Sequence, residues 1–342
     1  MILRKAGNNV KAVVVGSGSW GTGLAQVLCD NNEDVMIYGN CESEIQDINE
    51  HHQNAKYFEG VELNPSLKAT TDIRVVKDAD VIVLSIPTIA VESVCKEIDA
   101  LLDHKVVVVN TSKGFHPNTF ERMSDVIRRN ISAEHLSSVV SLIGPSHAEE
   151  VVIRMLTTIC AVSQNEADAQ KIQKLFSNDY LRIYTGTDET GSEIGVAVKN
   201  AIALASGVLY GLGYGDNTRA ALITRGLMEM TRYGVALGGK KETFMGLTGI
   251  GDLIVTCTSK HSRNFQAGYE IGKHNSAQYF WDNNTKTVEG VRTAKAVHEN
   301  AKRLGIEMPI VNEIYQVLFE NKNPRDSAKD LMLRDLKSEI NF

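Results

Sequence analysis

The chain has 342 residues, more than a typical single domain, and this length predicts two domains. Its hydrophobic content of 43%, with 23% charged residues, is that of a globular protein able to bury a large core. The net charge of −6 argues against a nucleic-acid-binding protein, because such proteins carry a basic surface.

The cysteines and the apolar segments indicate the cellular compartment of the protein. Its five cysteines are odd in number and widely spaced, with no CxxC pair, which favours a reducing compartment over a disulfide framework or a zinc site. The first ten residues lack the apolar core of a signal peptide. The longest apolar tract, Ala201–Tyr214, is short and glycine-rich. We therefore expect a cytoplasmic protein with no membrane span and no metal.

The first half of the chain alternates short β-branched runs with longer amphipathic stretches. Apolar strands separated by helices are typical of a parallel sheet covered on both faces. The expected strands are Lys11–Val15, Val35–Tyr38, Val81–Ser85, Val106–Asn110, Val139–Ile143 and Thr157–Val162. The expected helices between them include Gly21–Asp30, Ile89–Leu102 and Glu121–Arg128.

The pattern changes after about Leu181–Thr185, and from Ser192 onward the apolar spacing is mostly helical. Helices are expected over Asn217–Leu237, Val291–Leu304 and Ile310–Phe319. The fold class is therefore α/β. We expect a Rossmann-like, mostly parallel sheet domain over residues 1–190, which binds a dinucleotide. An all-helical domain over 191–342 would bind the substrate and carry the catalytic residues.

A glycine motif joins the first expected strand to the first expected helix. Gly16, Gly18 and Gly21 have the GxGxxG spacing of a dinucleotide-binding loop, and Ser19 and Trp20 lie between the last two. The three glycines allow a tight turn, close approach of the pyrophosphate, and close helix–strand packing. Amides at the start of the helix then hold the phosphates. A bare glycine motif is weak evidence, but here it lies in the required strand–turn–helix context.

The second strand ends at Asn40, beside the expected position of the adenosine ribose. Many NAD-specific enzymes have Asp or Glu there. Asn40 can bind a ribose hydroxyl without repelling a 2′-phosphate, and no Arg or Lys occurs between Met36 and Ala55 to attract one. Glu42 is a second neighbour, equally compatible with a solvated surface role. The residues leave the choice between NAD and NADP open.

Other loops follow the expected strands at the same edge of the sheet, over residues 85–87, 111–115 and 144–148. Ligands of open parallel sheets bind beyond this carboxyl edge. Lys113 taken alone is typical of a surface lysine, and Ser146 of a helix N-cap. Their shared edge favours a common ligand site.

The second half contributes one lysine and one aspartate to the expected chemistry. Lys199 lies in a very apolar helical segment, so it either extends to the surface or is held in a pocket, where burial would favour its neutral form. Asp252 follows a glycine-rich turn and is either a helix N-cap or a partner for a cation. Thr256, four residues later, would share its helix face. Ser262, Arg263 and Asn264 offer hydrogen-bond donors suited to a phosphate.

Six motifs together resemble the bacterial type of NAD(P)-dependent glycerol-3-phosphate dehydrogenase, and the resemblance covers essentially the whole chain. They are GSGSWGT at 16–22, NTSKGF at 110–115, GPSHAEEV at 144–151, VKNAIA at 198–203, TGIGDLIVTCTSKHSRN at 248–264 and VEGV at 288–291. The resemblance implies a reversible hydride transfer between dihydroxyacetone phosphate and sn-glycerol 3-phosphate, which would supply glycerophospholipid synthesis. Asn40 and Thr287 depart from the family's usual residues.

The resemblance also implies residue roles. Lys199 would be the proton acceptor in glycerol 3-phosphate oxidation and the donor in reduction, with Lys113 and Asp252 assisting. The implied substrate contacts are Lys113, Gly144, Ser146, Lys199, Asp252, Ser262, Arg263 and Asn264. The implied cofactor contacts are Gly16, Gly18, Ser19, Trp20, Gly21, Asn40, Lys113, Ala148, Arg263, Thr287 and Glu289.

Two other interpretations remain open at this point. One is a dehydrogenase of the same two-domain plan that acts on another oxo acid or phosphorylated alcohol. Arg263 in the loop at 259–264 bears on this choice, because an enzyme for a substrate without a phosphate would have less use for it. The other is a non-catalytic dinucleotide sensor, against which the presence of Lys113, Lys199 and Asp252 speaks. The expected partners are a small-molecule substrate and, through apolar helices of the second domain, a second copy in a homodimer.

Overall fold

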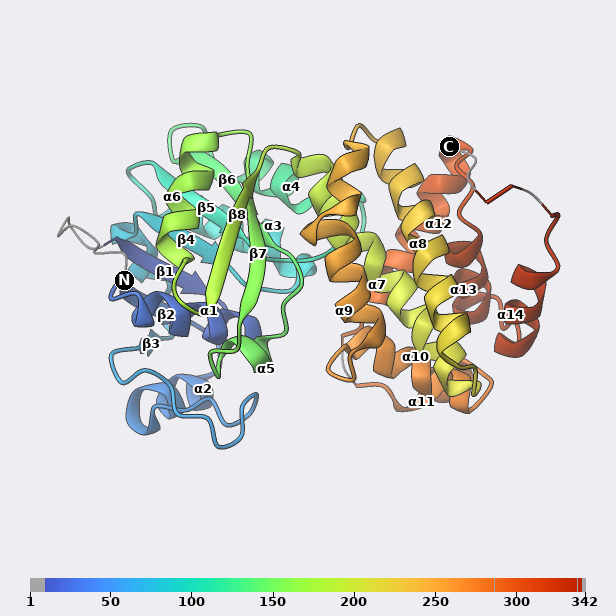
Figure 1. Ribbon diagram of the computed structural model, residues 1–342. Helices are drawn as coiled ribbons and strands as arrows, with labels where there is room; N and C mark the ends of the chain where they lie inside the picture. Colours follow the sequence, from blue (N-terminus) through green and yellow to red (C-terminus); the bar gives the residue numbers. More distant parts are fainter. Residues whose placement is uncertain (1–9, 286, 337, 340–342) are drawn as a thin grey trace. The chain divides into compact units, whose positions relative to one another are not determined.

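The computed structural model describes residues 10–285, 287–336 and 338–339, and these form two compact units (Figure 1). The first unit comprises the described residues up to Ser112 together with 123–142 and 146–187. The second comprises 113–122, 143–145 and the described residues from Asp188 onward. The sequence predicts a single boundary near residue 190, whereas two short segments, 113–122 and 143–145, cluster with the helical unit.

An eight-stranded sheet forms the centre of the first unit, in the order β3-β2-β1-β4-β5-β6-β7-β8. Pairing is parallel for β1 with β2 and β4, β2 with β3, β4 with β5, β5 with β6, and β7 with β8. The strands are β1 (Lys11–Val15), β2 (Asp34–Tyr38), β3 (Lys68–Thr70), β4 (Val81–Leu84), β5 (Val106–Asn110), β6 (Leu136–Ile143), β7 (Thr157–Val162) and β8 (Leu181–Gly186). This confirms the Rossmann-like, mostly parallel sheet.

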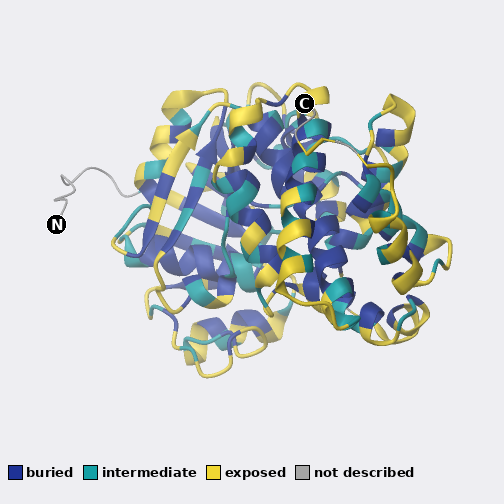
Figure 2. Cartoon of the chain, turned by 45° about the vertical axis from the view of Figure 1, so that its right-hand side comes forward, coloured by how far each residue is buried: buried dark blue, intermediate teal, exposed yellow. Residues whose placement is uncertain are grey.

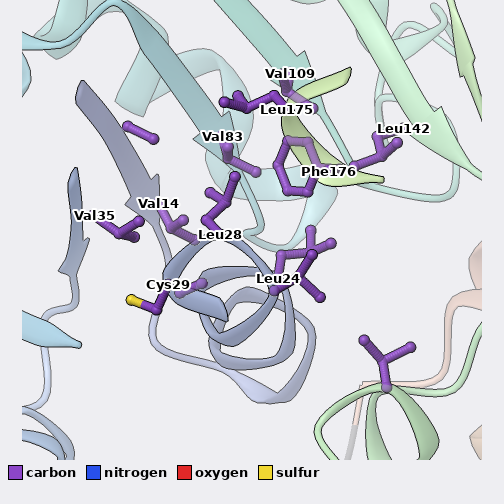
Figure 3. Close-up of a cluster of buried hydrophobic side chains, with 14 of the residues drawn as sticks. Val14, Leu24, Leu28, Cys29, Val35, Val83, Val109, Leu142, Leu175 and Phe176 are labelled. Carbon is purple, nitrogen blue, oxygen red and sulfur yellow. The ribbon is translucent and has the colours of Figure 1, made fainter. Parts of the chain in front are cut away.

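Helices cover both faces of this sheet because its strands are apolar on both sides. Val14 and Val109 pack in one cluster with α1 (Ser19–Asp30) and α6 (Glu166–Phe176). Their neighbours Val13 and Val108 pack in another with α3 (Thr88–Asp99) and α4 (Met123–Asn130). Successive strand residues point to opposite faces of the sheet, so the side chains of one continuous apolar strand pack into both hydrophobic clusters. Figure 3 shows the first cluster, with Leu24 and Leu28 of α1 against the strands.

Short helical segments complete the first unit. They are α2 (Glu42–Gln46), a π-helical turn (Asp47–His51), a 3₁₀ helix (Ile73–Asp78) and α5 (Ala148–Val151). The pattern of the sequence does not predict α2, α5, α6, β3 or β8. Strand β3 is only three residues long, and β8 alternates buried and exposed residues at the edge of the sheet, so neither carries the apolar run that reveals the central strands.

The second unit is built around one long apolar helix, α7 (Glu189–Gly211), nearly every residue of which is buried up to Val208. Asp188 caps it by accepting a hydrogen bond from the amide of Gly191, as N-cap residues do. By length and composition α7 is the one helix of the described chain that could cross a membrane, but 83% of its most apolar stretch is buried inside the unit. Figure 2 colours each residue by its burial and shows dark blue, buried residues in the helices of this unit as well as in the strands of the first.

The other helices of this unit pack around α7. They are α8 (Asp216–Ala236), a 3₁₀ helix (Lys241–Met245), a π-helical turn (Leu247–Gly251), α9 (Asp252–Thr258), α10 (Arg263–Lys273), α11 (Gln278–Asn283), α12 (Glu289–Leu304), α13 (Pro309–Phe319) and α14 (Pro324–Met332). Helix α10 packs very closely against α7, and this requires a glycine at position 268. A Cβ on Gly268 would lie 2.0 Å from the carbonyl oxygen of Leu204. This close crossing brings the first turn of α10 beside the middle of α7.

Candidate active site

The glycine motif forms the turn between β1 and α1 in the first unit. The amide of Gly16 donates to the carbonyl of Tyr38 at the end of β2 (2.8 Å), so the loop closes directly over the sheet. Gly16 has a positive φ of 120°, and a Cβ there would lie 2.3 Å from the carbonyl oxygen of Ser85. A Cβ on Gly21 would lie 2.0 Å from the carbonyl oxygen of Gly16. These two glycines are therefore required by the loop itself.

Gly18 differs from its two neighbours, because its surroundings are open. Within the described part of the chain no heavy atom lies within 4 Å of a Cβ built on Gly18, and its φ of −67° suits any residue. Gly18 is the N-cap of α1 and brings no side chain to the amides of the first turn. A helix start of this kind binds phosphate oxygens, so the loop fits a dinucleotide pyrophosphate in the space that a side chain would fill.

The remaining cofactor candidates of the first unit surround this loop. Ser19 and Trp20 form the first turn of α1 and are half-buried, and the indole nitrogen of Trp20 is buried without a hydrogen-bond partner among the described residues. Ala148 begins α5, and its carbonyl oxygen would lie 3.7 Å from a Cβ on Gly23 of α1. Asn40 is exposed just after β2. Ser146 is half-buried, and the N-cap of α5 is His147 rather than Ser146.

The proton-transfer candidates meet inside the second unit. Lys199 projects from α7 and is 3% exposed, and Asp252 at the start of α9 is 1% exposed. The Lys199 Nζ lies 2.5 Å from Oδ1 of Asp252 and donates to Oγ1 of Thr256 at 2.8 Å. Thr256 in turn donates to the backbone carbonyl of Asp252 at 2.6 Å, on the shared helix face that the spacing predicts. Lys199 is thus buried against its two partners and does not extend to the surface.

Asp252 is not a helix N-cap, contrary to one of the two interpretations of the sequence. Gly251 occupies the N-cap position, and Asp252 is the first residue of α9, after a π-helical turn. Its carboxylate faces α7 instead, because Gly195, one turn before Lys199, lets the 248–249 backbone approach. A Cβ on Gly195 would lie 2.4 Å from the carbonyl oxygen of Thr248. The sequence around Gly195 carries no signal of this close approach.

The environment of Lys199 gives it the titration range of an acid–base catalyst. Burial disfavours the charged ammonium, while Asp252 favours it and Lys113 opposes it. The net result lowers the pKa of Lys199 to about 7. Both protonation states are then populated near neutral pH, which is the condition for donating a proton in one direction of a reaction and accepting it in the other.

Lys113 is the second cationic side chain of this cluster, besides Lys199. Its Nζ donates to the carbonyl oxygen of Gly144 at 2.9 Å and lies 3.4 Å from Oδ2 of Asp252. The Lys113 side chain is 20% exposed, whereas that of Lys199 is 4% exposed, so Lys113 is the more accessible of the two. The structure therefore brings four candidates together in the second unit: Lys113, Gly144, Lys199 and Asp252.

The first turn of α10 lies beside this cluster. Ser262 caps the helix by accepting from the amide of Phe265 (3.2 Å), and Arg263 follows as an exposed first helical residue. Asn264 is buried, and its side chain donates to Oδ1 of Asn200 (2.9 Å), the residue after Lys199. Asn264 Oδ1 also accepts from the amide of Gly290 (2.8 Å). Asn200 therefore connects α7 to the first turn of α10, a role that the sequence did not predict.

Two further cofactor candidates lie at the start of α12. Glu289 is the first residue of this helix, and burial raises its pKa, while the charges of Arg292 and Arg263 oppose this rise. Arg263 and Glu289 therefore lie within electrostatic reach of one another. Thr287, two residues earlier, is exposed. Among the described residues, no group of three or more His, Cys, Asp or Glu side chains is placed to hold a metal ion.

Comparison with known proteins agrees with this arrangement. Residues 11–169 match the N-terminal model of NAD-dependent glycerol-3-phosphate dehydrogenase, and residues 188–329 match its C-terminal model. The chain is 48% identical over 333 residues to a glycerol-3-phosphate dehydrogenase [NAD(P)+] of Enterococcus faecalis, covering 97% of this chain and 98% of the relative. It is 49% identical over 330 residues to one from Listeria monocytogenes, covering 96% and 98%.

A solved structure extends this likeness to the fold. The crystal structure of glycerol-3-phosphate dehydrogenase from Coxiella burnetii superposes with a TM-score of 0.89 at 29% identity, covering 95% of this chain and 99% of that one. The two family models together account for most of the chain, including the glycine loop, Lys113, Lys199 and Asp252. The chain belongs to the family of NAD-dependent glycerol-3-phosphate dehydrogenases, and it is an NAD(P)-dependent oxidoreductase.

Proposed function

We propose that this chain catalyses the reversible NAD(P)H-dependent reduction of dihydroxyacetone phosphate to sn-glycerol 3-phosphate and so supplies glycerophospholipid synthesis. The observation that carries the proposal is the buried contact between Lys199 and Asp252, with Thr256 as a third partner. A ketone reduction needs an acid near the carbonyl oxygen, and Lys199 is the group in this cluster whose pKa is lowered to about 7.

The residues divide the work of this reaction. A nicotinamide dinucleotide, when bound, would supply the hydride in reduction and accept it in oxidation. In reduction, the ammonium of Lys199 donates a proton to the developing alkoxide, and in oxidation its neutral amine accepts one. Asp252 orients the ammonium and keeps part of the lysine protonated at neutral pH, against the cost of burial. The hydroxyl of Thr256 fixes the direction of a second Nζ hydrogen bond.

We assign substrate binding to residues around the Lys199–Asp252 pair. Arg263, as the exposed first residue of α10, presents a guanidinium where the helix amides also favour an anion, so we assign it to the substrate phosphate. Lys113, which donates to Gly144, is assigned to the carbonyl oxygen and to the nicotinamide side of the site. Ser146, Ser262 and Asn264 are kept as substrate contacts. The dinucleotide contacts are those predicted from the sequence.

We also keep the proposed division of the chain into a dinucleotide-binding domain over residues 1–190 and a helical substrate-binding and catalytic domain over 191–342. Lys113, Gly144 and Ser146 would reach the substrate from the first range, and Arg263, Thr287 and Glu289 would reach the cofactor from the second. A cytoplasmic location is supported by the five cysteines, all of which are free thiols. The homodimer expected from the sequence stays a prediction, which light scattering of the purified protein would test.

The test of this function is the loss of reduced-nicotinamide absorbance when purified protein meets dihydroxyacetone phosphate. We expect turnover with NADH and NADPH, and sn-glycerol 3-phosphate as the product. Unphosphorylated dihydroxyacetone and a phosphorylated aldehyde serve as the comparison substrates. A protein that binds both dinucleotides but reduces none of these carbonyls would be the non-catalytic sensor, and preference for another carbonyl would make it a different dehydrogenase.

A further inference from the structure

An ion pair between Glu44 and Lys56 lies at the end of β2, beside the glycine loop. Glu44 belongs to α2, and Lys56 lies twelve positions along the chain in the segment after the π-helical turn. Lys56 Nζ lies 2.6 Å from Oε1 of Glu44, whose side chain is only 7% exposed, whereas that of Lys56 is 61% exposed. The pair thus has a buried anionic end and an accessible cationic end.

The anionic end is tied directly to the dinucleotide loop. Ser17, between the first two motif glycines, donates its hydroxyl to Oε2 of Glu44 at 2.5 Å. A Cβ on Gly39, the residue after β2, would lie 2.3 Å from the same hydroxyl oxygen. The backbone carbonyl of Ser17 accepts from the side chain of Asn54 (2.9 Å). The carboxylate of Glu44 therefore connects Lys56 to the glycine loop, since it binds both Lys56 and Ser17.

The cationic end lies close to the residue after Asn40. Lys56 and Cys41 are near enough for the charge of each to affect the pKa of the other. In Rossmann-type domains the end of the second strand faces the adenosine ribose, whose 2′ substituent distinguishes the two nicotinamide dinucleotides. Asn40 carries no charge. The charged groups that the structure fixes at this point are Glu44 and Lys56.

We propose that the Glu44–Lys56 pair sets the choice between NADH and NADPH, with Lys56 binding the 2′-phosphate and Glu44 opposing it. This inference rests on the proposed function only in requiring that the glycine loop binds a dinucleotide. An ammonium has three donors, so Lys56 can keep its bond to Glu44 and still donate to a phosphate. With opposite charges side by side, the same site would accept both cofactors.

The two side chains oppose each other electrostatically. Burial raises the pKa of Glu44, but hydrogen bonds from Lys56 and Ser17 outweigh that effect and hold it below its ordinary value. Glu44 is thus an anion at neutral pH. Removing the Lys56 charge leaves this anion to repel a 2′-phosphate, whereas removing the Glu44 charge leaves Lys56 free to attract one more strongly.

The experiment is calorimetric titration with ADP-ribose and with its 2′-phosphorylated form, which measures binding without turnover. Lys56→Gln should weaken binding of the 2′-phosphorylated probe roughly tenfold relative to ADP-ribose, because one charge-assisted contact is lost. Glu44→Gln should shift the ratio of the two dissociation constants in the opposite direction. Lys96→Gln is the matched control, since Lys96 is also 61% exposed and also pairs with a glutamate, at 2.7 Å.

Added salt provides a second readout. In wild type, salt should weaken binding of the 2′-phosphorylated probe more than that of ADP-ribose, and Lys56→Gln should reduce this difference. If each substitution weakens binding of the two probes by the same factor, the pair only stabilises the loop and the inference is wrong. An unchanged ratio in Lys56→Gln also overturns it. If wild type binds neither probe, it is the dinucleotide-binding function that fails. Thermal unfolding of each variant confirms that it is folded.

Discussion

Lys199 Nζ lies 2.5 Å from Oδ1 of Asp252, and the two side chains are 4% and 1% exposed. Two charges buried at this depth depend on each other, because removal of either partner leaves an uncompensated charge in a dry environment. The partner also sets the chemistry, since Asp252 opposes the fall in the pKa of Lys199 that burial causes. The contact therefore links the stability of this cluster to its pH range.

Asp252→Asn should lower the pKa of Lys199 further below about 7. Reduction requires the protonated amine, so its rate should fall as pH rises through the pKa, and in the variant this fall should begin at lower pH. The check is the pH profile of kcat/KM for dihydroxyacetone phosphate. Asp216→Asn is the control, because Asp216 is a 90% exposed partner of Arg219. An unshifted profile in a folded Asp252→Asn variant would contradict the assigned role.

Gly18→Ala should leave the fold intact but weaken dinucleotide binding, since its Cβ would enter the space that we assign to the pyrophosphate. Gly21→Ala should instead destabilise the protein, because its Cβ would lie 2.0 Å from the carbonyl oxygen of Gly16. Thermal unfolding and NADH fluorescence titration separate the two effects. Tight NADH binding by Gly18→Ala would place the pyrophosphate elsewhere.

Arg263→Ala should lower kcat/KM for dihydroxyacetone phosphate by roughly 10- to 150-fold, because a charge-assisted hydrogen bond contributes about 1.5–3 kcal/mol. Residual reduction of unphosphorylated dihydroxyacetone should change much less, since that substrate lacks the group held. Arg263→Lys should restore part of the loss, having the charge without the planar fork. If the ratio of the two kcat/KM values is the same in wild type and variant, Arg263 does not bind the phosphate.

Glu229 offers a test of stability away from the proposed site. It is buried on α8, accepts hydrogen bonds from the amides of Ile310 and Val311 at the start of α13, and burial raises its pKa to about 7. The folded state thus holds a proton that the unfolded state releases above pH 4.5. The unfolding free energy should therefore fall between pH 4.5 and 7, by about 3 kcal/mol at most.

Glu229→Gln removes this titration and keeps an oxygen acceptor for α13. Denaturant unfolding across that pH range should show a fall in wild type that is smaller in the variant. Parallel curves for the two proteins would mean that Glu229 titrates normally in the folded state.

The central strands and the dinucleotide loop could be predicted from sequence because their signals are local. Apolar runs mark β1, β4 and β5, and the glycine spacing follows directly from the turn it has to form. Edge strand β8 could not be recognised, since half of its side chains are exposed and it resembles a loop. Helix α7 was recognised as apolar but not as one helix beginning at Glu189.

The candidate site was predictable as a set of residues but not as a set of contacts. Whether Asp252 capped its own helix or paired with Lys199 depended on the close approach permitted by Gly195, a contact between segments more than fifty residues apart. The Glu44–Lys56 pair was overlooked for a related reason. Lys56 lies outside the stretch next to β2 and returns to it only through the fold.

Lys199→Ala, with single-turnover kinetics, tests the central claim most directly. The rate of NADH oxidation by dihydroxyacetone phosphate should fall by about 10²–10⁴-fold, because a positioned acid–base group is lost, while NADH binding measured by fluorescence should stay near the wild-type value. Near-normal turnover in a folded Lys199→Ala variant would contradict the account, leaving Lys199 a structural residue and Lys113 the candidate proton donor.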